Sequence, residues 1–158
     1  MKQAGKMSVA AAVMLAMIAT IAFGQGKPRD IPLSMVTDDG LTVHAWLTLP
    51  SRPTSAPLVV LLPMRGRTHA SYEPFIEAVF DYFAHDSAAK GKVRPYILNC
   101  DLRGHGKSTR IGNKTVSFES MSNEHYKRIP KDIAELVEHV VADSNYRIDT
   151  NAIMIVGA

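Results

Sequence analysis

The chain has 158 residues, of which 46% are hydrophobic and 21% charged, a composition that predicts one globular domain. Its formal charge is only +3, and its basic side chains are scattered among acidic ones, which argues against a nucleic-acid-binding surface. The single cysteine, Cys100, cannot form an internal disulfide. It stands in an apolar run, which predicts a small buried side chain and argues against a catalytic thiol.

Residues 1–24 have the layout of a secretory signal. Lys2 and Lys6 give a positive start, an uncharged apolar stretch covers residues 7–23, and small residues precede a predicted cleavage after Gly24. The alternative is an uncleaved anchor, because the stretch approaches the roughly 18 residues of a spanning helix. Its alanine-rich sequence favours the signal. We therefore predict export to the periplasm or outside the cell, with no stable membrane span after cleavage.

An antiparallel hairpin is predicted to open the domain. Apolar and polar side chains alternate over residues 41–49, which is the period of a strand with one buried face. Asp39-Gly40 is a hairpin turn signal that pairs this strand with residues 33–37. After a linker rich in Pro and Ser, residues 58–62 are continuously apolar, which is typical of a parallel strand covered on both faces.

Helices and strands then alternate. Apolar residues at helical spacing predict a helix over 72–83, and residues 96–100 form the next strand. A second helix is predicted over 129–141, starting or kinking at Pro130, before a last strand over 152–156. This order predicts an α/β fold with three αβα layers, in which the hairpin is followed by a parallel βαβαβ unit.

The most specific motif is the loop 101–108, Asp-Leu-Arg-Gly-His-Gly-Lys-Ser, directly after a strand. Gly104 and Gly106 allow a tight turn, Asp101 can accept hydrogen bonds from its backbone amides, and Arg103 can reach a neighbouring loop. Gly106-Lys107-Ser108 matches the end of a phosphate-binding loop, but the first glycine of that motif would stand at position 101, which is Asp. A phosphate-binding loop is therefore excluded. We interpret the loop as structural rather than catalytic.

Catalytic alternatives within the chain are weak. Ser108 as a nucleophile would need a base such as His105 or His125 within hydrogen-bond reach, oriented by a third group, and the sequence offers no such arrangement. No second ligand stands at a metal-binding spacing around His105. The histidines are all interpreted as surface or turn residues: His44, His69, His85, His105, His125 and His139.

Taken together, these motifs resemble the N-terminal half of an α/β-hydrolase of the esterase, lysophospholipase and dienelactone-hydrolase-like kind. The resemblance covers nearly all of residues 33–158 and rests on the loop 101–108 and the final Gly157-Ala158. In such enzymes this last strand leads into Gly-x-Ser-x-Gly, the turn that exposes the nucleophile. Gly157 and Ala158 match its first two positions, so the resemblance implies a nucleophilic serine at position 159, with the acid and the histidine later still.

The resemblance also implies an oxyanion loop at residues 63–67, after the strand 58–62. There the backbone amide of Met64 or Arg65 would stabilise charge on a substrate carbonyl oxygen. An ordinary strand-to-helix connection with surface arginines is the alternative.

We therefore expect residues 25–158 to be an incomplete α/β-hydrolase domain, exported and inactive by itself. The full-length relative would be a serine hydrolase of carboxylic esters or related acyl compounds, with no metal and no organic cofactor. We also expect the isolated product to aggregate or be degraded unless a complementing chain completes the sheet, because the strand 152–156 carries neither charge nor Pro to blunt an open edge. The alternatives are an exported non-catalytic binding domain and a fragmentary gene model.

Overall fold

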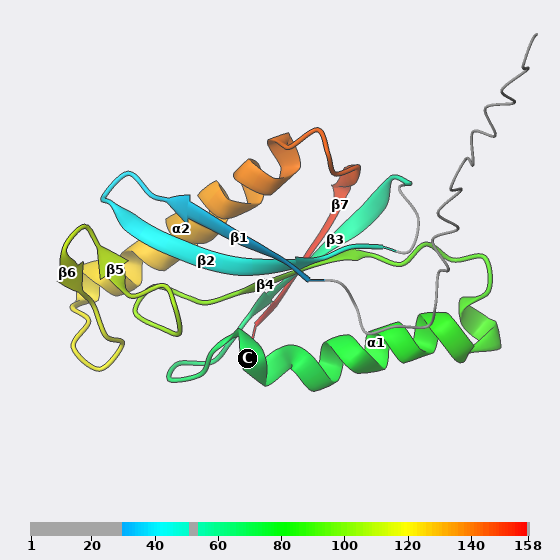
Figure 1. The fold of residues 1–158 in the computed structure, drawn as a ribbon, viewed down its shortest axis with the longest axis horizontal. Helices are drawn as coiled ribbons and strands as arrows, with labels where there is room; N and C mark the ends of the chain where they lie inside the picture. Colours follow the sequence, from blue (N-terminus) through cyan, green and yellow to red (C-terminus); the bar gives the residue numbers. More distant parts are fainter. Residues whose placement is uncertain (1–29, 51–53, 158) are drawn as a thin grey trace, which may run out of the picture.

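The computed structural model describes residues 30–50 and 54–157, so the predicted signal over residues 1–24 and the final Ala158 lie outside the described residues. The centre of the molecule is a mixed, twisted sheet (Figure 1). Its main strands lie in the order β1-β2-β4-β3-β7. Among the described residues, no helix combines the length and the hydropathy needed to cross a bilayer.

The predicted hairpin is confirmed. β1 (Asp30–Val36) and β2 (Leu41–Thr48) run antiparallel, and the amide of Gly40 donates to the carbonyl of Thr37 across the turn at 2.9 Å. Gly40 has φ +80°, a conformation that favours glycine. The apolar members of β2 are buried as their alternation predicts.

Three strands form the predicted parallel part of the sheet: β3 (Ala56–Leu62), β4 (Tyr96–Cys100) and β7 (Ile148–Gly157). β3 is parallel to both β4 and β7, while β4 is antiparallel to β2. All residues of β4 are buried, because it has strands on both sides and helices over both faces. The carboxyl ends of β3, β4 and β7 therefore lie at one edge of the sheet, where ligands bind in folds of this kind.

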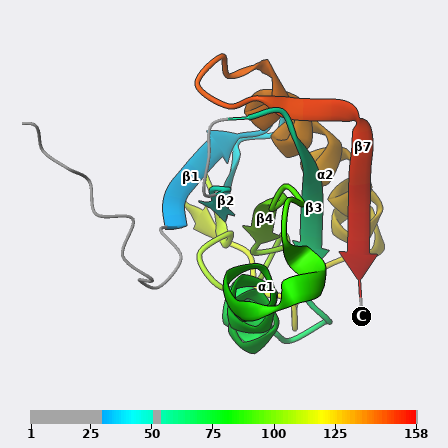
Figure 2. The ribbon, with the colours of Figure 1, turned by 90° about the vertical axis from the view of Figure 1, so that its right-hand side faces the viewer.

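The two helices cover opposite faces of this sheet (Figures 1 and 2). α2 (Asn123–Ala142) buries Ile133, Leu136 and Val140 against the larger core cluster, whereas α1 (Glu73–His85) buries only Ile76. The α2 face thus holds most of the hydrophobic core, and the α1 face is filled much less.

Local details differ from the sequence expectations. α2 begins at Asn123, and Pro130 lies inside it; Ser122 and His125 form a capping box that starts the helix earlier than the apolar spacing indicates. A short hairpin, β5 (Arg110–Ile111) and β6 (Lys114–Thr115), pairs with β2. Strands of two residues are too short to show a period, so no sequence pattern predicts them.

The outer edge of β7 is apolar. Met154 and Ile155 are 60% and 59% exposed, although they belong to a strand that pairs with β3 along its other edge. An uncovered apolar strand edge is a template for pairing with other chains.

Met154→Lys is expected to reduce aggregation of the chain, because a lysine blunts an open strand edge. Val93→Lys, which adds the same charge to an exposed valine of a loop, is the matched control. Light scattering against concentration should show a higher aggregation threshold for Met154→Lys alone, with the urea midpoint of both variants close to that of the parent. Equal thresholds for the two variants would contradict an edge-specific effect.

Candidate functional site

Two loops leave the sheet at the carboxyl ends of neighbouring parallel strands. Residues 63–68 follow β3, and residues 101–108 follow β4. Gly157 pairs with Leu62, so the end of β7 lies beside the start of the first loop. The structure therefore gathers the predicted oxyanion loop, the structural loop and the start of the predicted nucleophile turn at one edge of the sheet.

The loop 101–108 is a compact, self-bonded turn. The amide of Gly104 donates to the carbonyl of Ser108 at 2.8 Å, and the amide of Ser108 donates to the carbonyl of His105 at 2.8 Å. Gly106 has φ +50°, and a Cβ there would lie 2.1 Å from the carboxylate of Asp101. Only glycine fits that position.

Ser108 has a structural role in this loop. It is fully buried; its hydroxyl donates to the carbonyl of Asp101 at 2.8 Å and accepts from the amide of His44 at 2.9 Å. Both partners are backbone groups, so the hydroxyl has no base beside it. This excludes Ser108 as a nucleophile, the alternative weighed from the sequence.

Arg103 joins the loop to two distant elements. Its buried guanidinium donates to Asp132 on α2 at 2.7 and 2.6 Å, and to Asp39 in the β1–β2 turn at 2.7 and 3.0 Å. The hydrogen bonds from Arg103 hold the pKa of Asp39 well below its ordinary 3.8. Burial raises the pKa of Asp132, against the pull of Arg103.

Asp101 connects this loop to the one after β3. One carboxylate oxygen accepts from the amide of Lys107 at 2.9 Å within its own loop. The other accepts from the backbone amide of His69 at 2.8 Å and from its ring Nδ1 at 2.9 Å. The His69 ring also stacks on Trp46, with the ring centroids 3.4 Å apart.

The sequence predicts His105 to be a surface or turn residue; it lies in the turn of the loop 101–108, but it is not at the surface. Its ring is buried and stacks on Phe118, with centroids 5.0 Å apart. Nδ1 lies 2.8 Å from the carbonyl of Arg103, and Nε2 accepts from the amide of Gly66 at 2.9 Å. Since a carbonyl can only accept and an amide N–H can only donate, the ring is neutral with its proton on Nδ1.

The predicted oxyanion residues lie in a turn beside this histidine. The amide of Arg67 donates to the carbonyl of Met64 at 3.0 Å, and Gly66 takes φ +77° within that turn. Among the described residues, the backbone amides of Met64 and Arg65 have no hydrogen-bond partner. The Met64 side chain is 55% exposed, and the Arg65 guanidinium lies 5.6 Å from the Tyr126 ring centroid.

Other nucleophiles are unsuitable. Burial raises the pKa of the Cys100 thiol to about 12, so the thiol stays protonated and inert. Ser122 and His125 touch at 3.4 Å, but this contact belongs to the capping box of α2, where the ring Nδ1 already accepts from the Ser122 amide. Within the part of the chain that the structure describes, no group of three His, Cys, Asp or Glu side chains is placed to hold a metal ion.

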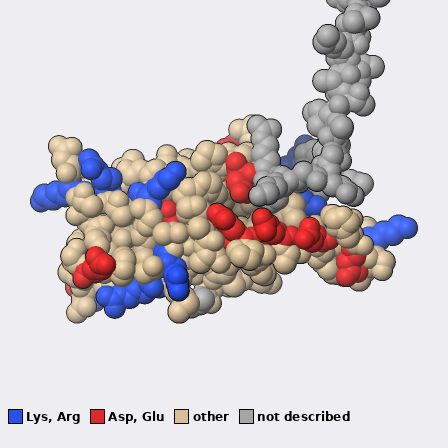
Figure 3. Space-filling model, turned by 60° about the horizontal axis from the view of Figure 1, so that its bottom comes forward, with Lys and Arg blue, Asp and Glu red and all other residues tan. Residues whose placement is uncertain are grey.

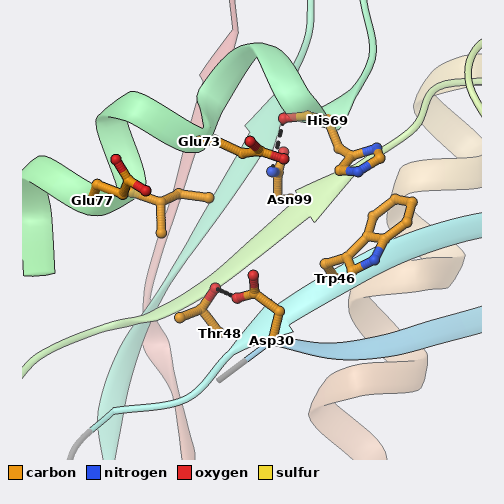
Figure 4. A pocket seen from close by; sticks show the side chains of 8 residues that line it. Asp30, Trp46, Thr48, His69, Glu73, Glu77 and Asn99 are labelled. Atoms are coloured by element: carbon orange, nitrogen blue, oxygen red, sulfur yellow. Dashed lines mark hydrogen bonds between the residues drawn. The ribbon is translucent and has the colours of Figure 1, made fainter. Parts of the chain in front are cut away.

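A pocket of about 300 Å³ lies on the α1 face of the sheet, and His69 and Trp46 line one side of it (Figure 4). The described residues that line it include carboxylates and no lysine or arginine, so this lining favours neutral or cationic groups over anions. Figure 3 shows a row of acidic side chains over α1, whose acids Glu73, Glu77 and Asp81 repeat every four residues. The lining residues are Asp30, Trp46, Thr48, His69, Glu73, Ile76, Glu77 and Asn99.

Comparison with known proteins identifies the fold. No protein-family model and no curated protein matches the sequence. A ferulic acid esterase from Anaeromyces mucronatus, solved with ferulic acid, is similar with a TM-score of 0.58 and 16% identity, over 82% of this chain and 48% of that one. An esterase of Pyrococcus furiosus is similar with a TM-score of 0.54 and 14% identity, over 82% of this chain and 40% of that one.

The described residues have an α/β-hydrolase fold. A 2,6-dihydroxy-pseudo-oxynicotine hydrolase adds a third likeness, with a TM-score of 0.54 and 17% identity over 82% of this chain and 30% of that one. The predicted fold class is thereby confirmed. The chain spans less than half the length of each of these solved structures.

The contacts between the loop after β3 and the loop after β4 were not predicted from the sequence. Asp101 and His69 are 32 residues apart, and His105 and Gly66 are 39 apart, so no local spacing connects them. The one available signal was the position of His105 between two glycines of a turn directly after a buried strand.

Gly106→Ala is expected to destabilise the chain more than Gly112→Ala. Both glycines have positive φ, at +50° and +54°, so each alanine carries a backbone cost of about 1–2 kcal/mol. Only at position 106 does the new methyl meet the Asp101 carboxylate, which must move and lose hydrogen bonds worth about 1–3 kcal/mol each. Urea unfolding measures the difference, and equal losses would contradict the tight fit.

Asp39→Asn is expected to flatten the pH dependence of stability. Because the pKa of Asp39 is lowered on folding, its stabilising effect is present above about pH 4 and is lost as pH falls below that. The parent should therefore lose free energy of unfolding more steeply than the variant between about pH 5 and pH 3. Asp81→Asn, on the exposed face of α1, is the control and should follow the parent curve.

Proposed function

We propose that this chain forms the N-terminal part of an exported serine hydrolase that acts on carboxylic esters. Its contribution to catalysis is the oxyanion loop, in which the backbone amide of Met64 or Arg65 donates to the carbonyl oxygen of the substrate as negative charge develops there. The nucleophile belongs at position 159, at the turn after β7.

One observation carries this proposal. The amides of Met64 and Arg65, which have no hydrogen-bond partner in the part of the chain that the structure describes, lie at the carboxyl edge of the parallel strands, in the loop that starts where Leu62 pairs with Gly157. A nucleophile two residues beyond Gly157 would stand close to this loop, which is the arrangement that acyl transfer requires. The likeness to two esterases and a hydrolase agrees with this reaction class.

Substrate and location are parts of the same proposal. The names of the similar structures favour a small carboxylic ester, and ferulic acid esters are a natural first trial because one of them was solved with ferulic acid. Export rests on the signal-like residues 1–24, with Lys2 and Lys6 before the apolar stretch. The open edge of β7 is where a complementing segment or chain would pair.

Residues 1–158 alone are proposed to be inactive. Within the described part of the chain, no serine or cysteine has a histidine base that is itself oriented by a carboxylate. The two histidines with buried partners, His69 and His105, serve loop contacts instead.

The first test is the coding DNA beyond codon 158. We expect an open frame with serine at position 159, followed later by an acid and a histidine. In the longer protein encoded by that open frame, replacing the serine with alanine should lower kcat on p-nitrophenyl acetate by about 10⁴-fold or more. Met64→Pro and Arg65→Pro each remove one amide N–H, and the one that removes the oxyanion donor should lower kcat by about 10²–10³-fold.

Met64→Ala keeps the amide and is the control for side-chain loss in the Met64→Pro variant.

Residues 1–158 alone should give no turnover above a heat-denatured sample. Serine-reagent-sensitive turnover by residues 1–158 would overturn the proposed inactivity. A protein with a nucleophile in which neither proline variant slows the reaction would overturn the oxyanion assignment. Soluble, cooperatively folded residues 25–158 that bind a ligand without hydrolysis would favour the non-catalytic binding domain.

A further inference from the structure

The turn that carries the candidate oxyanion donors has few contacts of its own. Met64, Arg65, Gly66 and Arg67 are all exposed, and the single hydrogen bond within the turn joins the Arg67 amide to the Met64 carbonyl. An exposed turn of this kind does not fix the direction of its amides by itself. Its geometry must come from what holds it at either side.

His105 holds the turn in its middle. Its Nε2 accepts from the amide of Gly66, the residue directly after the two candidate donors. A Cβ at Gly66 would lie 3.5 Å from the Phe118 ring, which also stacks on His105. The turn therefore rests on a pair of stacked rings.

The His105 ring is itself fixed. Its Nδ1–H donates to the carbonyl of Arg103, the residue whose guanidinium is bound by Asp39 and Asp132. Because this bond takes the ring proton, Nε2 is left as an acceptor directed at Gly66. The end of the loop after β3 has a separate contact, because Asp101 accepts a hydrogen bond from the amide of His69.

We propose that His105 is a positioning residue for the oxyanion loop: its Nε2 anchors the amide of Gly66 and so sets the direction of the Met64 and Arg65 amides. This inference rests on the proposed function for its role in catalysis. The anchoring itself is a property of the folded chain and is testable without a substrate.

Three substitutions separate the anchor from general packing. His105→Gln places an acceptor oxygen at about the distance of Nε2 from the backbone. His105→Asn has the same chemistry but is one methylene shorter, and His105→Leu fills the space with no acceptor. The Gln variant should keep the anchor, and the Asn and Leu variants should lose it.

The primary readout is hydrogen exchange of the Gly66 amide in the whole chain, measured by NMR. The loss of a hydrogen bond worth about 1.4 kcal/mol should speed this exchange about tenfold in the Asn and Leu variants. The Gln variant should stay within about threefold of the parent, and the amides of Ile97 and Leu98 in β4 should be unchanged in all variants. Unchanged exchange in the Leu variant, or exchange in the Gln variant as fast as in the Asn variant, would overturn the anchor.

The second readout is kinetic and uses the longer protein that carries the serine at position 159. Displaced oxyanion donors should lower kcat by about 10²-fold in the Asn and Leu variants with little change in KM, and Gln should restore most of the loss. Gly66 exchange that responds as expected while kcat does not would overturn the catalytic part of the inference. Absence of ester hydrolysis in the parent would instead count against the proposed function, and the exchange result would stand.

Discussion

The buried guanidinium of Arg103 is the interaction on which the other parts of this structure depend. Its four hydrogen bonds bind the β1–β2 turn through Asp39 and the helix α2 through Asp132. A planar, permanently charged group with several donors can satisfy two carboxylates at once, which a lysine ammonium cannot do with the same geometry. Removal of either carboxylate would leave part of a buried charge unpaired, and that is costly.

The same residue connects this structural centre to the candidate site. The carbonyl of Arg103 orients the ring of His105, and that ring accepts from Gly66 in the loop after β3. Asp101 provides a parallel connection to His69 at the other end of that loop. The loop 101–108 is therefore bonded within itself and also contacts both the middle and the end of the loop after β3.

The two faces of the sheet are unequally filled. The α2 face holds the large apolar core, whereas the α1 face holds a small cluster, an acidic pocket and the stacked pair of Trp46 and His69. β7 shows the same feature at its open edge, where Met154 and Ile155 are exposed.

The sequence by itself determined the order of the main strands and helices, the hairpin at Asp39-Gly40 and the fold class, because these depend on local period and turn chemistry. It also marked Asp101, Arg103 and the two glycines of their loop, since their spacing is characteristic. Only the tertiary structure decided where those side chains reach. The carboxylates that bind Arg103 and the amide that binds His105 belong to residues 29 to 64 positions away in the sequence. No pattern along the chain encodes such contacts. Burial likewise belongs to the assembled fold: His105 lies in a loop, and it is buried only because Phe118 and the turn at Gly66 pack against it.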